Sequence, residues 1–89
     1  MNKFKNVNYQ PIATVVSSFG LNGEVRLKPT SRYFEEYISR SELGISKSRF
    51  DLSPIKITNV RGSGKKKLFK FEGINSRVDA QFINGHTIF

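Results

Sequence analysis

Residues 12–28, which read IATVVSSFGLNGEVRLK, contain the clearest structural signal in the chain. Residues 12–17 are rich in β-branched side chains, which is typical of a strand. Residues 18–23 hold two glycines and an Asn-Gly pair, and these residue types tolerate the positive φ of a tight turn. The remaining residues alternate with period two, which places Val25 and Leu27 on one face and the charged side chains on the other. The stretch therefore predicts a β-hairpin.

The second half of the chain predicts further strands. Residues 54–60 alternate between apolar and polar side chains, a glycine-rich turn follows at 62–64, and residues 67–72 return as the partner strand. We expect a short, irregular strand over 43–49 and a closing strand over 86–89. Six strands in so short a chain favour a small antiparallel β-barrel, because closing the sheet removes its exposed edges.

Two short helical segments are expected between the strands. Aromatic and apolar residues at helix-like spacings predict a single turn or short helix within residues 30–42. Residues 76–79, Ser-Arg-Val-Asp, fit a helix N-terminus in which the serine side chain accepts a backbone hydrogen bond. Val78, Phe82 and Ile83 then form a one-sided apolar stripe on this second helix.

The composition restricts the class of protein. The chain has 89 residues, fifteen Lys and Arg against seven Asp and Glu, a net charge of +8 and no cysteine. This length fits one domain with a small core, and the lack of cysteine excludes a disulfide framework and thiolate metal sites. No apolar run is long enough to span a membrane, and polar residues follow the first lysines where a signal peptide would be apolar. We expect a cytoplasmic monomer with a flexible arm over residues 1–10 and one domain over residues 11–89.

Few residues could support catalysis. The single histidine, His86, lies beside Gly85 in a predicted turn, where a structural role is expected. We find no nucleophile–base pair and no cluster of metal-ligating residues in the sequence. The run Gly62-Ser63-Gly64-Lys65-Lys66 lacks the spacing of a phosphate-binding loop and has a lysine where the magnesium-ligating hydroxyl is required. The sequence therefore predicts a protein that is not an enzyme and needs no cofactor and no metal.

The basic residues form two groups that could contact the phosphates of a nucleic acid. One group lies in and beside the glycine-rich turn and consists of Arg61, Lys65, Lys66, Lys67 and Lys70. The other group, Arg26 and Lys28, is placed on the outer face of the first hairpin by the alternation of its second strand. The alternative is a lysine-rich turn that only keeps the protein soluble and protects a sheet edge. Phe69 and Phe71 could stack on RNA bases if their rings were exposed. Their spacing in an amphipathic strand instead assigns them to the core.

Three motifs, in order along the chain, resemble the N-terminal domain of the RimM family of bacterial 16S rRNA processing and ribosome maturation factors. They are the hairpin turn GLNGEVR at residues 20–26, KFEGI at residues 70–74 and NSRVDA at residues 75–80. Gly85 before the last strand also fits, so the resemblance covers residues 12–89.

The resemblance implies a six-stranded barrel similar to the second domains of translation elongation factors. It also implies a role late in the assembly of the head of the small (30S) subunit, near 16S rRNA and ribosomal protein S19. Family members carry a second, PRC-type barrel with which much of the S19 binding is associated, and we expect that barrel to be absent from this chain. The turn departs from the family at Phe19, where His is frequent, and at Asn22, where Lys or Arg is frequent.

The residues by themselves predict a basic binding barrel, and the resemblance implies that it is a docking domain for 30S precursors. The residues assigned to rRNA or ribosome binding are Arg26, Lys28, Arg61, Lys65, Lys66 and Lys67. The residues assigned to a protein contact and to the turn are Phe19, Gly20, Asn22, Gly23 and Glu24, with backbone geometry as the simplest role of the two glycines and an ordinary surface position as the default for Glu24. The alternatives are a generic basic RNA-binding barrel or ribosomal-protein-like module, and a structural adaptor whose charge only aids solubility.

Overall fold

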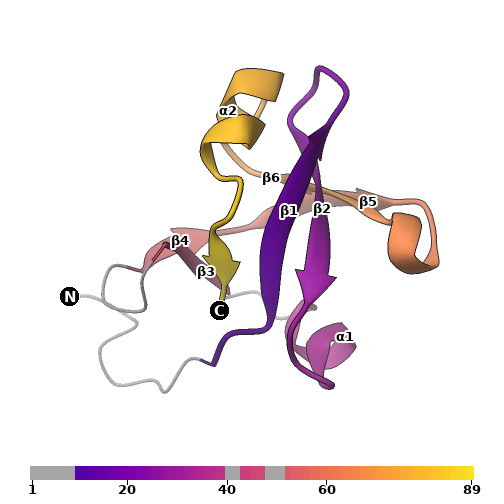
Figure 1. Ribbon diagram of the computed structural model, residues 1–89, viewed down its shortest axis with the longest axis vertical. Helices are drawn as coiled ribbons and strands as arrows, with labels where there is room; N and C mark the ends of the chain where they lie inside the picture. Colours follow the sequence, from indigo (N-terminus) through magenta and orange to yellow (C-terminus); the bar gives the residue numbers. More distant parts are fainter. Residues whose placement is uncertain (1–9, 40–42, 48–51) are drawn as a thin grey trace.

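The computed structural model describes residues 10–39, 43–47 and 52–89, and within them it contains seven strands and two short α-helices (Figure 1). The strands form one antiparallel sheet in the order β4-β3-β7-β1-β2-β6-β5. Their bounds are β1 (Ala13–Phe19), β2 (Glu24–Pro29), β3 (Leu43–Ser46), β4 (Ser53–Ile55), β5 (Ile57–Arg61), β6 (Leu68–Phe71) and β7 (Thr87–Ile88). The helices are α1 (Phe34–Tyr37) and α2 (Arg77–Phe82), and a 3₁₀ turn, η1 (Gly64–Lys66), lies between β5 and β6.

The first hairpin is confirmed. Strands β1 and β2 pair antiparallel, with Phe19 opposite Glu24 at the turn and Ala13 opposite Pro29 at the far end. The register shifts between Val15 and Ser17, so one extra residue of β1 bulges out of the pairing. The predicted closing strand is also present, because β7 pairs with both β1 and β3.

The sheet has seven strands, not the expected six, because the strand predicted over residues 54–60 is divided at Lys56. β4 pairs with β3, whereas β5 pairs with β6, so this segment changes partner in its middle. β4 and β5 stand at the two ends of the hydrogen-bonded order and are connected through the backbone of Lys56. The structure thus confirms a small all-β domain with two short helices, but its hydrogen-bonded order has two ends where a closed barrel would have none.

The core collects the apolar faces of the strands. Its fully buried side chains include Phe71, Ile12, Leu43, Ile88, Val15 and Val25. Phe69 is buried as well, so both phenylalanines of β6 belong to the core, as their spacing predicts. The ring of Phe34 on α1 meets the ring of Phe69 edge to face, with centroids 6.2 Å apart. This contact holds α1, which lies within the predicted segment 30–42, against β6.

Helix α2 begins as predicted but buries a different face. The side-chain oxygen of Ser76 accepts a hydrogen bond from the backbone N–H of Asp79 at 3.1 Å. Ala80 and Ile83 are buried, whereas Val78 is 74% exposed and Phe82 is 81% exposed. Residues three apart lie on one face of a helix, and the small side chain of Ala80 lets α2 pack closely on β1. The prediction of a one-sided apolar stripe is therefore wrong, because only Ile83 of its three residues reaches the core.

Two other predictions fall partly on residues that the structure does not describe. Residues 1–9 of the predicted arm, and residues 48–49 of the strand predicted over 43–49, lie outside the described residues. Within the described ranges, neither helix has the length and apolar character needed to cross a membrane.

Candidate nucleic-acid interface

Phe19, at the end of β1, is exposed and is contacted by two arginines from other strands. The guanidinium carbon of Arg26, on β2, lies 5.5 Å from the centroid of the Phe19 ring, and that of Arg61, on β5, lies 5.9 Å from it. Both distances are typical of cation–π contacts. We call these three residues the Phe19 patch. The sequence assigned Phe19 to protein contact and the arginines to RNA, and the structure brings the two groups together.

Glu24 anchors one arginine of the Phe19 patch. Nε of Arg61 donates to Oε2 of Glu24 at 2.6 Å, and Nη2 donates to Oε1 at 2.9 Å. Glu24 is buried, although its alternation with Val25 predicted an outer position and a surface carboxylate was the default. Glu24 is buried because Arg61, from a strand distant in sequence, covers its carboxylate.

The electrostatics of this pair are those of a hydrogen-bonded ion pair. The hydrogen bonds from Arg61 lower the pKa of the Glu24 carboxyl below its usual value, even though burial acts in the opposite direction. The same contact raises the pKa of Arg61. The Arg61 side chain stays 56% exposed, so the guanidinium is held in place and still reaches solvent.

The turn between β1 and β2 is shaped by its glycines. Gly20 and Gly23 both have positive φ, 68° and 88°, as the turn chemistry predicts. Gly23 also lies so close to the backbone of Ile74 that an added Cβ would overlap the Ile74 carbonyl oxygen. Lys70 binds the same carbonyl through Nζ and donates to Oδ1 of Asn75 at 2.7 Å. Lys70, grouped with the basic residues in the sequence, therefore fixes the loop on which the turn rests.

The predicted lysines are not among the cations that contact the Phe19 ring. Lys28, Lys65 and Lys67 line a groove of about 570 Å³ whose other walls include Leu27 and Phe34. Lys66 is exposed on η1, and Asn22 is exposed at the turn. The six basic residues predicted as a binding site are thus divided: two arginines contact Phe19, three lysines line the groove, and Lys66 does neither.

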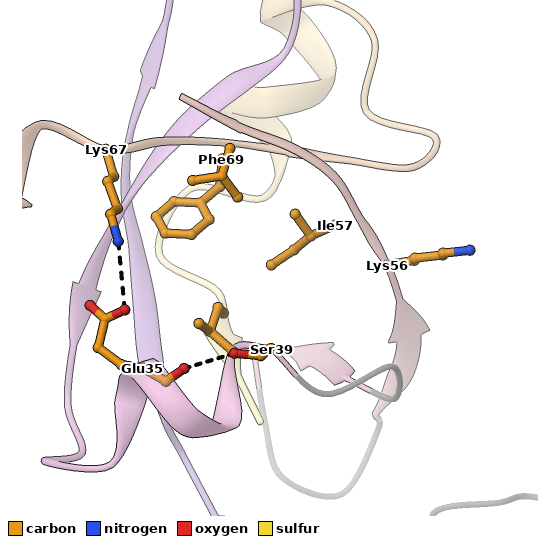
Figure 2. A pocket seen from close by; sticks show the side chains of 8 residues that line it. Glu35, Ser39, Lys56, Ile57, Lys67 and Phe69 are labelled. Carbon is orange, nitrogen blue, oxygen red and sulfur yellow. Dashed lines mark hydrogen bonds and ion pairs between the residues drawn. The ribbon is translucent and has the colours of Figure 1, made fainter. Parts of the chain in front are cut away.

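Glu35, on α1, is the residue of this region that the sequence did not indicate. Its Oε2 lies 3.5 Å from Nζ of Lys67, and Figure 2 shows this ion pair crossing the space between α1 and β6. The two residues are far apart in the chain, so no local pattern signals their contact. Lys67 is consequently less available to an external phosphate than Lys65 or Lys66.

His86 occupies the turn between α2 and β7, as expected for a structural residue. Its backbone N–H donates to Ile83 at 3.0 Å, and its carbonyl accepts from the N–H of Val15 at 2.9 Å. Nδ1 of its ring is buried without a hydrogen-bond partner among the described residues. In the same part of the chain, no group of three or more His, Cys, Asp or Glu is placed to hold a metal ion.

Comparisons with known proteins agree on one family. The family model described as the RimM N-terminal domain matches residues 11–89. The ribosome maturation factor RimM of Chlorobium luteolum is 31% identical over 75 residues, which make up 84% of this chain and 45% of that protein. A crystal structure of RimM from Pseudomonas aeruginosa, described as a 16S ribosomal RNA processing protein, has the same fold with a TM-score of 0.72 at 20% identity, over 89% of this chain and 48% of that chain. The chain thus spans a little under half the length of each relative. Because the family match extends from Pro11 to the last residue, the chain belongs to the RimM N-terminal domain family.

Proposed function

We propose that this domain acts in the cytoplasm as a docking module in ribosome maturation and carries out no reaction of its own. Its exposed cations bind 16S rRNA phosphates on a precursor of the 30S subunit, near the head and ribosomal protein S19. By holding rRNA and protein together, the domain raises their effective concentration for correct assembly. Membership of the RimM family supports a role in ribosome maturation, and the arrangement of positive charge on the surface supports a contact with rRNA phosphates.

The Phe19 patch is the observation that supports this proposal most. Three side chains from β1, β2 and β5 meet at one exposed place, and a buried carboxylate fixes one of the two guanidinium groups. Planar guanidinium groups bind phosphate oxygens through two donors at once. The patch can therefore receive an anionic backbone with little further ordering of its side chains, since contacts within the domain already restrict them.

Co-sedimentation with 30S precursor particles tests the proposal. In the variant Arg26→Gln we expect association to fall roughly threefold, because one phosphate contact is lost. The matched control, Arg77→Gln, removes the same charge from an exposed position elsewhere and should retain most of the binding. An equal loss in both variants would show that net charge alone drives association.

Two further comparisons separate the finer parts of the proposal. Binding to naked 16S rRNA as tight as binding to precursor particles would favour the generic RNA-binding module, which the net charge of +8 also permits. Reconstituted particles prepared with and without S19 test the protein contact. If both bind equally, this domain does not contact S19.

A further inference from the structure

Two grooves on this domain share three lining residues, and two of these residues form an ion pair. The first is the groove of about 570 Å³ beside Lys28 and Lys65, and the second, of about 460 Å³, lies between α1 and β5. Glu35, Lys67 and Phe69 line both grooves. In Figure 2, Lys67 and Glu35 meet across the gap, with Phe69 beside them. We call the combined feature the trough, and the Glu35–Lys67 ion pair is a strap across it.

The strap is weak enough to open. The two charged atoms are 3.5 Å apart, and the Glu35 side chain is 75% exposed. Exposed ion pairs contribute little to stability because water competes for both charges. An anionic ligand can therefore replace Glu35 as the counter-ion of Lys67 at small cost.

The floor of the trough is apolar and mainly aliphatic where it is accessible. Val16 and Val60 are exposed, while Leu27 is half-buried. The phenyl rings of Phe34 and Phe69 are buried beneath, so their faces are not open for stacking. Such a floor accepts an apolar side chain by excluding water, but it offers no platform for an RNA base.

The charged side chains around the trough are all positive except Glu35 of the strap. Lys28, Lys65 and Lys67 line the first groove, and Glu35 is the one carboxylate among the described residues that line either groove. Lys56 lines the second groove, but its amino group points away from the centre in Figure 2. An apolar floor beside lysines is complementary to a chain that alternates large apolar side chains with carboxylates.

We propose that the trough binds an extended acidic segment of a partner protein, with a large apolar side chain on the floor and carboxylates on Lys28, Lys65 and Lys67. Binding opens the strap, because a carboxylate of the partner takes the place of Glu35 on Lys67. This site is distinct from the Phe19 patch and goes beyond rRNA docking. It gives the domain a contact with protein on one surface and a contact with RNA on another.

NMR titration with a blocked peptide of sequence Asp-Glu-Leu-Phe-Glu-Asp tests the site. We expect saturable shifts of the backbone amides of Val16, Leu27 and Val60. The substitution Glu35→Gln should tighten binding by roughly two- to fivefold, because it frees Lys67 and removes the competing carboxylate. The matched control is Glu36→Gln, which makes the same change in net charge at the next, exposed residue of α1 and should bind like the unaltered domain.

Several results would overturn the proposal. They are the absence of saturable shifts, equal binding of a peptide with serine in place of the leucine and phenylalanine, and equal tightening by Glu35→Gln and Glu36→Gln. A uridine oligonucleotide that shifts the same amides more strongly than the peptide would assign the trough to RNA. Loss of rRNA association is read on precursor particles with Arg26→Gln, a residue that does not line the trough, so either proposal can fail without the other.

Discussion

Arg61 and Glu24 are 37 residues apart in the chain and are joined by two hydrogen bonds of 2.6 and 2.9 Å. Glu24 begins β2 and Arg61 ends β5, and β6 lies between these strands in the sheet. The pair therefore connects both sides of β6 and places the Arg61 guanidinium against Phe19. One contact thus contributes to the fold and also sets the geometry of the candidate interface.

Replacing Glu24 with glutamine should lower the stability of the domain in a pH-dependent way. The pKa of Glu24 is lowered in the folded protein from 4.5, chiefly by the hydrogen bonds from Arg61. A lowered pKa means that the stabilisation is complete above about 4.5 and is lost as pH falls through the folded value. We expect Glu24→Gln to reduce the melting temperature by about 5 °C at neutral pH, and this difference should shrink below pH 4.5. Thermal unfolding followed by circular dichroism measures it.

Glu36→Gln is the control for this measurement. Glu36 is exposed on α1, so its replacement should change the melting temperature little at any pH. A Glu24→Gln difference that stays constant from neutral to acidic pH would contradict the role given to the ionised carboxylate.

Alanine at Gly23 should destabilise the domain far more than alanine at Gly20. Both residues have positive φ, which costs an L-residue about 1–2 kcal/mol. Gly20 has open space around it, so that conformational cost is all that Gly20→Ala should incur. At Gly23 the new Cβ meets the carbonyl oxygen of Ile74, and backbone on one side or the other has to move. Urea denaturation of the two variants gives the comparison, and equal losses would contradict the close approach.

Phenylalanine-to-alanine substitutions should separate the core from the exposed face of α2. Phe71 is fully buried, so Phe71→Ala should cost about 3–5 kcal/mol and leave much of a small domain unfolded. Phe82→Ala should change stability by no more than about 0.5 kcal/mol, because that side chain is exposed. Chemical denaturation measures both. A large loss for Phe82→Ala would show that α2 buries the apolar stripe that its sequence suggests.

The salt dependence of RNA binding should reflect the internal ion pairs. Six phosphate contacts by the predicted basic residues would give a log–log slope of about −4 to −5. Arg61 and Lys67 already have carboxylate partners, so each releases few counterions even where it touches a phosphate, and the remaining four have no carboxylate partner among the described residues. Four free contacts reduce the expected slope to about −3 to −4. Titrating the dissociation constant for a 16S rRNA fragment against salt concentration checks this, and a slope near zero would contradict phosphate binding.

The limits of sequence-based prediction are clear at α2 and at Lys56. The Ser76 cap is a contact between near neighbours, so its spacing in the sequence revealed it. Which face of α2 meets β1 is set by the packing of these two separate elements, and it is the face of the small Ala80 that is buried, whereas Val78 is exposed. The division of a strand at Lys56 likewise depends on its two partner strands. These are β3 and β6, and both lie outside residues 54–60, so the pattern of that stretch does not reveal them.

The amino-acid sequence alone determined the first hairpin, the all-β class, the start of α2 and the excess of positive charge. Each of these depends on residues within a few positions of one another, or on composition, and local backbone preference suffices for it. Tertiary structure decided the burial of Glu24, the contact of two arginines with Phe19 and the Glu35–Lys67 ion pair across the trough. These contacts join residues from separate elements, so they exist only after packing of the core has set the spacing between those elements.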